Sequence, residues 1–226
     1  MITFSNVSKK YSNETDFALS DLSLHIEKGE FLFIVGKSGA GKSTFMKLLL
    51  REELPTSGLV SVLGNDVSQI KAGRLPYYRR QIGVVFQDFR LLENKTVYEN
   101  ISFAMEIIQA DPKKISKTTP TILNMVGLRD KARKYPASLS GGEQQRVAIA
   151  RSIINSPKIL ICDEPTGNLD PLTSAGIMNL LDDINKLGTT VVIATHDITM
   201  VDRMKRRVVV LDEGVVVSDR IGGYYN

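Results

Sequence analysis

The sequence has a single cysteine and no long hydrophobic run. With only Cys162, an internal disulfide is excluded, and such sparing use of cysteine suits a reducing compartment. The longest apolar stretches, such as 159–162, 191–194 and 208–211, have the length of strands, whereas a membrane span needs about 18 or more apolar residues. The first residues also lack the charged and apolar regions of a secretory signal. We therefore expect a chain that does not itself cross a bilayer.

The bulk composition is that of an ordinary globular protein. The chain has 226 residues, of which 42% are hydrophobic, so it is long enough to bury a core. It has no internal repeat, low-complexity tract or linker that would mark a second independent domain. Its net charge of +4 suits an anionic membrane surface or nucleic acid as a neighbour, and equally an ordinary solvated surface. Charge alone therefore does not identify a partner.

Residues 36–43 read GKSGAGKS and fit the phosphate loop G-x-x-x-x-G-K-[ST]. The apolar run 31–35 precedes the motif and the helix-like segment 44–50 follows it, which is the context that the motif requires. Glycines let backbone N–H groups surround phosphate oxygens, and a helix N-terminus favours anions. A chance glycine-rich turn is the alternative, and it is rare in this context. We expect these residues to bind the nucleotide: Gly36, Lys37, Ser38, Gly39, Ala40, Gly41, Lys42, Ser43 and Thr44.

Two members of this loop have separate predicted tasks. Lys42 is expected to reach the β- and γ-phosphates, and the Ser43 hydroxyl to ligate Mg²⁺. Another candidate magnesium ligand, Asp163, follows the apolar run 159–162 and precedes Glu164. Buried strands carry acids only where they emerge at the edge of a sheet. Asp163 is therefore predicted to assist Mg²⁺, and Glu164 to orient or deprotonate an attacking water, whereas the pair on its own would more often be an ordinary loop start.

Hydrophobic periodicity predicts an α/β fold with a helical insert. From 88 to 155 the apolar spacing is helical, with Thr119 as a helix N-cap and Pro120 as the first helical residue. Strands alternating with helices indicate parallel strands joined by crossover helices. We predict a P-loop NTPase core with a mostly parallel sheet and an N-terminal antiparallel β subdomain. One domain then spans 1–226, with its core in 1–87 and 156–226 and its helical subdomain in 88–155. The expected strands are 2–4, 22–26, 59–63, 82–86, 158–162, 189–195 and 208–211, and the later helices 174–185 and 198–203.

A second glycine-containing segment, Ser140-Gly141-Gly142-Glu143, has two compatible interpretations. S-x-x-E is a capping box, which would open a helix over 144–154. A cap does not call for two consecutive glycines, because glycine lowers helix propensity in the first turn. Bare backbone at a helix start suits close approach to a phosphate. Both interpretations stay open on this segment alone.

Taken together, the motifs resemble the nucleotide-binding subunits of ABC transporters, essentially from end to end. Residues 139–144 look like that family's signature. Gln87 matches the Q-loop glutamine, Asp170 the D-loop aspartate and His196 the switch histidine, and Tyr11 lies where the family places an aromatic ring against adenine. For His196 the alternative is a hydrogen-bonded structural histidine, and for Tyr11 it is surface packing.

The resemblance implies a mechanism. Two subunits meet head to tail, and each ATP is held between one phosphate loop and the second copy's Ser140, Gly141 and Gly142. ATP binding closes the homodimer and hydrolysis releases it, which is a ligand-driven shift between two states. The family's switch histidine, here His196, contacts the γ-phosphate, and its Q-loop glutamine, here Gln87, links metal or water to the helical insert. Asp170 also belongs to the nucleotide site by this resemblance, and the cofactors implied are ATP and Mg²⁺.

Residues 78–88 and 96–106 resemble most the ATPases of bacterial cell-division complexes. This implies an integral membrane partner that docks on the groove near 88–105, at the cytoplasmic face of the cell membrane, with an indirect link to peptidoglycan hydrolases. In that groove Phe86, Phe89, Leu91 and Leu92 either form an apolar socket or pack internally. An ATPase subunit of a lipoprotein-release or efflux transporter is the alternative. A nucleic-acid partner is not expected, because the chain has neither long coiled-coil insertions nor a second ATPase domain.

Overall fold

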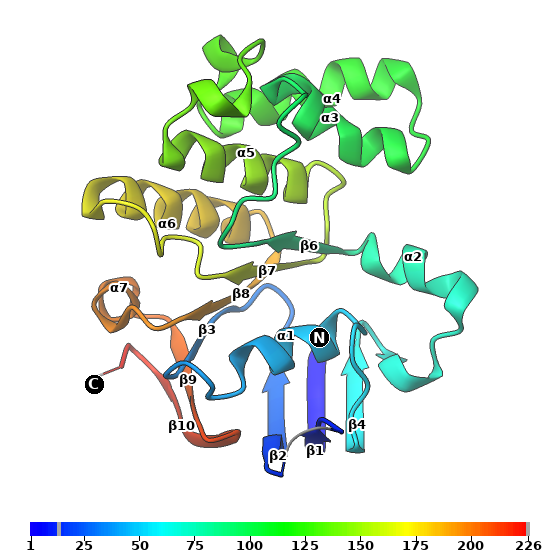
Figure 1. Cartoon of the computed structure of the whole chain (residues 1–226), viewed down its shortest axis with the longest axis vertical. Helices are drawn as coiled ribbons and strands as arrows, with labels where there is room; N and C mark the ends of the chain where they lie inside the picture. Colours follow the sequence, from blue (N-terminus) through cyan, green and yellow to red (C-terminus); the bar gives the residue numbers. More distant parts are fainter. Residues whose placement is uncertain (13–14, 225–226) are drawn as a thin grey trace.

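The computed structural model describes residues 1–12 and 15–224 and contains two β-sheets (Figure 1). The smaller sheet is antiparallel and has the strand order β2-β1-β4-β5. The larger sheet has the order β10-β9-β3-β8-β7-β6. The strands are β1 (Ile2–Lys10), β2 (Phe17–Ile26), β3 (Phe31–Val35), β4 (Ser57–Val62), β5 (Asn65–Asp66), β6 (Ile82–Val85), β7 (Ile159–Asp163), β8 (Thr190–Thr195), β9 (Arg207–Asp212) and β10 (Val215–Ile221).

Five strands of the larger sheet run parallel, and only β10 runs antiparallel, against β9. Every residue of β3 and of β8 is buried, which is the pattern of strands covered on both faces. Because parallel strands end at one edge, the segments that follow β3, β6, β7 and β8 meet there. The predicted fold class, an α/β core with a mostly parallel sheet, is confirmed.

Helices cover both faces of this sheet (Figure 1). Helices α3, α4 and α5 gather above it, α6 and α7 cover the same face, and α1 lies between the two sheets. None of the helices in the described residues is long and apolar enough to span a membrane. The helices are α1 (Lys42–Leu49), α2 (Leu75–Arg79), α3 (Val97–Ile107), α4 (Pro112–Met125), α5 (Gly141–Ile153), α6 (Pro171–Lys186) and α7 (Ile198–Met204).

Two hydrophobic cores hold the layers together. The larger core joins one face of the parallel sheet to α3, α5, α6 and α7. The smaller core fills the space between the two sheets and surrounds α1, where Phe45 stacks on Phe4 with ring centroids 4.6 Å apart. Burial of one apolar side chain of this size contributes about 1.5–3 kcal/mol. The helix that follows the predicted phosphate loop is therefore fixed from both sides.

The predicted helix start at Thr119 and Pro120 is wrong. Helix α4 begins at Pro112, with Asp111 as its N-cap, and Pro120 lies inside it. The Asp111 carboxylate accepts a hydrogen bond from the Lys113 N–H at 2.8 Å, so the cap-and-proline signal occurs eight residues earlier than we predicted. Helix α2 and strand β10 were not predicted at all, although residues of α2 and the residues before it join the smaller core.

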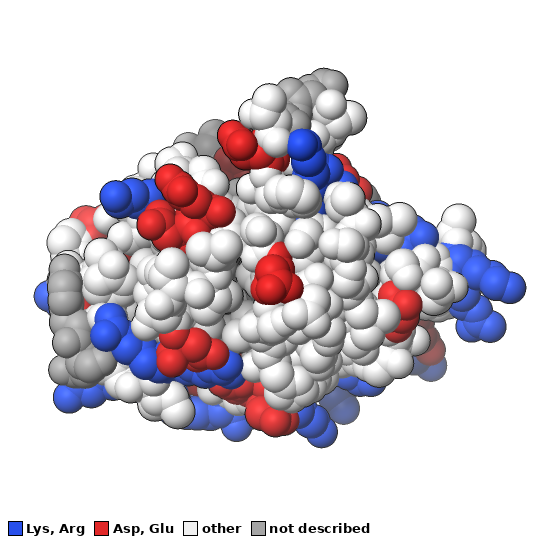
Figure 2. Space-filling view, turned by 90° about the horizontal axis from the view of Figure 1, so that it is seen from below, with Lys and Arg blue, Asp and Glu red and all other residues white. Residues whose placement is uncertain are grey.

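The face seen from below carries the antiparallel sheet and the β9–β10 hairpin (Figures 1 and 2). Figure 2 shows a broad uncharged area there, with most lysines and arginines at its margins. The net charge of +4 is therefore not concentrated on this face. The outward side chains of β1, β2 and β4 that are not buried include hydroxyls at Thr3, Ser5, Ser8, Ser23, Ser57 and Ser61.

Candidate active site

A cleft of about 1260 Å³ lies at the C-terminal edge of the parallel strands. It is lined from the segments after β3, β6, β7 and β8, with further residues from the region between β1 and β2. Gly36 and Ala40 are not among its lining residues, and Ala40 is buried. The predicted site residues that line it are Tyr11, Lys37, Ser38, Gly39, Gly41, Lys42, Ser43, Thr44, Gln87, Asp163, Glu164 and His196.

The loop between β3 and α1 has the backbone that its glycines permit. Gly39 and Gly41 have positive φ angles, +84° and +104°, where side chains with a Cβ are strained. A Cβ on Gly36 would lie 2.5 Å from the Leu211 carbonyl oxygen. At the start of α1, Gly41 is the N-cap and makes no side-chain capping bond. The first N–H groups of this helix therefore remain available to an anion.

The Lys42 side chain points back onto its own loop. Its ammonium group donates hydrogen bonds to the carbonyl oxygens of Gly36, at 2.5 Å, and Lys37, at 3.0 Å. Lys42 is half-buried and lines the same cleft as Asp163. A phosphate entering the loop would offer this ammonium group anionic acceptors in place of two neutral carbonyls, so that each hydrogen bond would also be an ion pair.

Glu164 is held firmly between two neighbours. One carboxylate oxygen lies 2.7 Å from Nδ1 of His196, and the other accepts a hydrogen bond from the Thr195 hydroxyl at 3.1 Å. The Glu164 backbone has a φ of +45°, a conformation that costs about 1–3 kcal/mol in a non-glycine residue and is frequent at functional sites. The Glu164 side chain is 13% exposed and that of His196 is 69% exposed. The pair therefore joins a fixed carboxylate to a histidine that is open to solvent.

The carboxyl group of Asp163 has a raised pKa. Burial is the largest cause, and the adjacent charge of Glu164 adds to it, whereas Lys42 opposes it. A divalent cation would relieve this crowding of negative charge. Asp163, Ser43 and Gln87 line one cleft and offer oxygen atoms, the ligands that Mg²⁺ prefers. These residues therefore fit a magnesium ion that also binds the phosphates.

The segment that contains Gln87 is tied to the helical part of the chain. Two residues that follow it, Phe89 and Arg90, have positive φ angles of 55° and 48°. The Arg151 guanidinium of α5 donates hydrogen bonds to both carbonyl oxygens, at 2.8 Å to Phe89 and 2.6 Å to Arg90. Burial lowers the pKa of Arg151. This contact connects the cleft to α5, and no local sequence motif marked Arg151 for it.

Tyr11 lies at the edge of the cleft. Its hydroxyl is 3.4 Å from the Thr44 hydroxyl, and the ammonium groups of Lys9 and Lys47 lie 5.0 and 5.8 Å from its ring centroid. Phe17, which is 47% exposed, lines the same cleft. Phe17 offers a second aromatic ring for an adenine, and the sequence did not predict it. The sequence also did not predict that Asp16, Ala18 and Glu213 line the cleft.

The predicted signature segment lies outside this cleft. Ser140 caps α5 in a capping box with Glu143, and the Ser140 backbone N–H is the largest cause of the lowered Glu143 pKa.

Gly142 is buried, and a Cβ there would lie 2.3 Å from Cγ2 of Thr173. Gly142 is therefore required for packing of α5 against α6, a reason that the sequence did not reveal. Gly141 is exposed. Helix α5 starts at Gly141, three residues before the predicted 144–154 helix.

Asp170 also lies outside the cleft, where it caps α6. Its carboxylate accepts hydrogen bonds from the N–H groups of Leu172, at 3.1 Å, and Thr173, at 3.0 Å. The Thr173 side chain is the largest cause of the lowered Asp170 pKa, and the backbone N–H groups add to it. In a single copy, therefore, neither Asp170 nor the signature segment shares the cleft that contains the phosphate loop.

Comparison with known proteins places the chain among ATP-binding cassettes. The family described as ABC transporter matches residues 19–167. The cell division ATP-binding protein FtsE of Mycobacterium tuberculosis is 52% identical over 225 residues, with 100% of this chain and 98% of the relative covered. FtsE of Bacillus subtilis is 51% identical at the same coverage, and FtsE of Escherichia coli is 44% identical, with 95% of this chain and 96% of the relative covered.

Solved structures agree with this assignment. The ATP-binding cassette MJ0796, in a dimeric post-hydrolysis state bound to ADP and Pi, is 35% identical with a TM-score of 0.86, and both chains are covered completely. CbiO1 from Clostridium perfringens, part of the ABC transporter complex cbiONQ, is 33% identical with a TM-score of 0.92, with 98% of this chain and 88% of that chain covered. The chain therefore belongs to the ABC transporter family, as an ATP-binding cassette that hydrolyses ATP.

Proposed function

We propose that this chain is the ATPase subunit of a bacterial cell-division complex. It acts as a homodimer at the cytoplasmic face of the cell membrane, bound to an integral membrane protein of the FtsX type, and its ATP cycle controls peptidoglycan hydrolases indirectly through that protein. The observation that carries the proposal is identity of about half of the residues, along the whole chain, to proteins named as cell division ATP-binding proteins.

The residues that line the cleft have the following proposed roles. The N–H groups of the phosphate loop and of the start of α1 hold the phosphates, and Lys42 turns from its loop carbonyls to the β- and γ-phosphates. Ser43, Asp163 and Gln87 hold Mg²⁺, which supplies charge neutralisation when it is bound. Glu164 accepts the proton of the attacking water, while His196 Nδ1 holds one of its carboxylate oxygens in place.

The second half of the site comes from another copy of the chain. The start of α5 has Ser140 and Gly141 exposed to solvent, and the first turn of a helix favours an anion at its N-terminus. Because this segment does not line the cleft of its own chain, it is free to meet the γ-phosphate held by the second copy. ATP then forms part of the interface, so binding closes the dimer and hydrolysis opens it. The relative MJ0796 was solved as a dimer bound to ADP and Pi, which supports this arrangement.

The catalytic proposal is tested by replacing Glu164 with Gln. Turnover should fall by about a hundredfold or more, because the general base is lost, while ATP binding persists and a stable dimer accumulates in gel filtration. Glu213→Gln is the matched control, since Glu213 lines the same cleft without an assigned task. Lys42→Ala should instead weaken nucleotide binding. Turnover by Glu164→Gln at the wild-type rate would refute the assignment of the base.

The membrane partner is proposed to dock on the groove near 88–105. Phe86, Phe89, Leu91 and Leu92 are all half-buried there. Leu91 packs against the larger core, and the guanidinium carbon of Arg90 lies 3.7 Å from the Phe86 ring centroid. Phe89 and Leu92 are therefore the two apolar side chains of this segment that are best placed to meet a partner.

Co-purification from membranes tests the partner. The chain should bring down an FtsX-type integral protein, and Phe89→Ser should weaken that association while the purified subunit keeps its ATPase activity. Ile107→Ser is the control, because Ile107 is 61% exposed at the end of α3 and lies outside the groove. Recovery of a partner belonging to an export apparatus would favour the ATPase of a lipoprotein-release or efflux transporter instead.

A further inference from the structure

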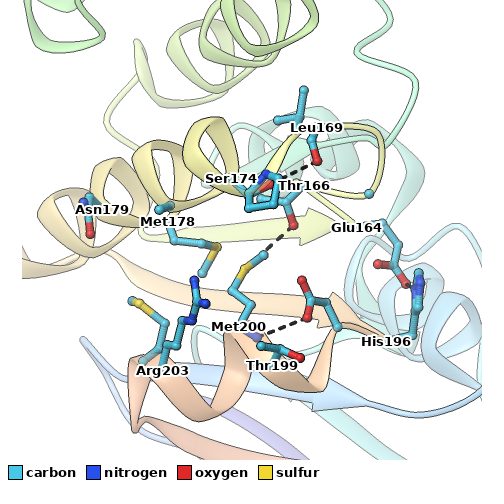
Figure 3. A pocket seen from close by; sticks show the side chains of 15 residues that line it. Glu164, Thr166, Leu169, Ser174, Met178, Asn179, His196, Thr199, Met200 and Arg203 are labelled. Atoms are coloured by element: carbon cyan, nitrogen blue, oxygen red, sulfur yellow. Dashed lines mark hydrogen bonds and ion pairs between the residues drawn. The ribbon is translucent and has the colours of Figure 1, made fainter.

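A second pocket, of about 700 Å³, lies between α6 and α7 next to the catalytic cleft (Figure 3). Glu164 and His196 line both the pocket and the cleft. Figure 3 shows Met178 of α6 and Met200 of α7 pointing into the space between the two helices, with Glu164 and His196 at one end. The pocket is therefore separate from the phosphate loop and yet adjoins the catalytic pair.

The middle of the pocket is lined by flexible apolar side chains, and polar and charged residues, among them Glu164, Asp197 and Arg203, line the rest of it. Met178, Met200 and Met204 contribute three thioethers, and Leu169 contributes an apolar wall. The Thr166 hydroxyl donates a weak hydrogen bond to the Met200 sulfur at 3.7 Å (Figure 3). Methionine adapts its shape to different apolar partners and is used at surfaces that bind them. The chemistry therefore suits an apolar side chain rather than a phosphate.

Leu172 lies at the border of this pocket. It is the second residue of α6, and Pro171, which precedes it, lines the pocket. Leu172 is 85% exposed, the highest value among the large hydrophobic side chains of the described residues. Asp170, two residues earlier, caps the helix and so fixes the position of its first turn. A single exposed leucine is ordinary on a protein surface, but Leu172 lies on a capped helix turn beside an apolar pocket and extends that pocket's apolar surface, and a contiguous apolar patch marks a contact surface.

We propose that Leu172 of one copy inserts into the methionine-lined pocket between α6 and α7 of a second copy. The inference rests on the proposed ATP-closed homodimer and adds a contact to it. In a two-fold dimer the contact occurs twice, because each copy supplies both the leucine and the pocket. We assign the occupant to a second copy because the pocket adjoins the cleft that this copy covers in the proposed dimer. Leu172 also lies two residues after Asp170, which the family resemblance places at the nucleotide site between the copies.

The contact would couple dimer closure to catalysis. The pocket shares Glu164 and His196 with the cleft, so an inserted leucine packs beside the residues that hold the base. Filling the pocket also removes water from one side of this pair, which strengthens electrostatic interactions there. Leu172 is in this sense a positioning residue, since it acts on Glu164 and His196 without touching ATP.

Dimerisation of the Glu164→Gln protein with ATP, measured by sedimentation velocity, tests the proposal. Adding Leu172→Glu should raise the dimer dissociation constant by about 100-fold or more, because two leucines lose their apolar pockets. Leu187→Glu is the matched control, since Leu187 is 71% exposed at the other end of the same helix and should change little. Equal dissociation constants for Leu172→Glu and Leu187→Glu would overturn the inference.

A cross-linking experiment tests directly whether Leu172 of one copy lies next to Met200 of the other. A short bismaleimide should join Leu172→Cys to Met200→Cys between copies of the Glu164→Gln protein in ATP and not without it, whereas Leu187→Cys should give no product with Met200→Cys. The native Cys162 is fully buried and contributes no background. If the ATP dimer forms but the cross-link does not, this inference fails and the proposed function stands. If Glu164→Gln forms no dimer with ATP, both fail.

Discussion

Substitution of Gly142 by alanine tests why the signature segment contains a buried glycine. The new Cβ would lie 2.3 Å from Cγ2 of Thr173, whereas ordinary contacts begin at 3.4 Å, so the Thr173 side chain must rotate or α5 and α6 must separate by about 1 Å. Overpacking of this kind costs about 1–3 kcal/mol, and replacing glycine within a helix returns about 0.5–1 kcal/mol. The middle of these ranges gives a net loss of about 1 kcal/mol in the free energy of unfolding, or roughly 2–4 °C in Tm.

The same clash provides a rescue variant. Thr173→Ser removes Cγ2 and keeps the hydroxyl, so the double variant Gly142→Ala/Thr173→Ser should regain most of the lost stability in urea unfolding. ATP-dependent dimerisation of the double variant then measures what glycine does beyond packing. If dimerisation stays impaired after stability returns, Gly142 also serves close approach to a phosphate. Gly142→Ala with wild-type stability, or no rescue by Thr173→Ser, would refute the steric reasoning.

Three further predictions concern residues outside the phosphate loop. Asn100 is fully buried and makes four hydrogen bonds with the backbone of 92–96. In a urea titration, Asn100→Ala should therefore lower the free energy of unfolding by about 3 kcal/mol. Asn124 is exposed, and Asn124→Ala should change this free energy little. Arg151→Met should accelerate hydrogen exchange in the loop after β6, because its two carbonyl acceptors lose their donor; unchanged exchange would disprove that link. The Glu143 pKa is lowered from 4.5 in the folded state. The charged Glu143 therefore stabilises the fold fully above pH 4.5, and this contribution is lost as the pH falls through the folded pKa. In Glu143→Gln, the free energy of unfolding should decrease less between neutral and acidic pH than in the wild type.

The sequence predicted those parts of the site that follow buried strands. Each of Gln87, Asp163 and His196 comes at or just after a strand of the parallel sheet, and the apolar run before it marks that strand. Because parallel strands end at one edge, their order along the chain was sufficient to predict that these residues meet. The phosphate loop was predictable for a simpler reason. Its glycines, the strand before it and the helix after it form one continuous stretch of the sequence.

The features that were missed depend on contacts between distant segments. Phe17 and Glu213 reach the cleft through two antiparallel pairings, β1 with β2 and β9 with β10, which no local motif predicts. Arg151 acts on Phe89 over 62 positions of sequence separation. Pro120 misled the helix assignment because a proline after threonine has the same local pattern at a helix start as inside α4. Tertiary packing decides between such cases.

The most direct test of the central claim is a structure of the Glu164→Gln protein with ATP and Mg²⁺. The account predicts two copies in head-to-tail contact, with Ser140 and Gly142 of each copy within hydrogen-bonding distance of the γ-phosphate bound to the other copy's Lys42. A structure in which each ATP is held by one copy alone, with the start of α5 left in solvent, would contradict it.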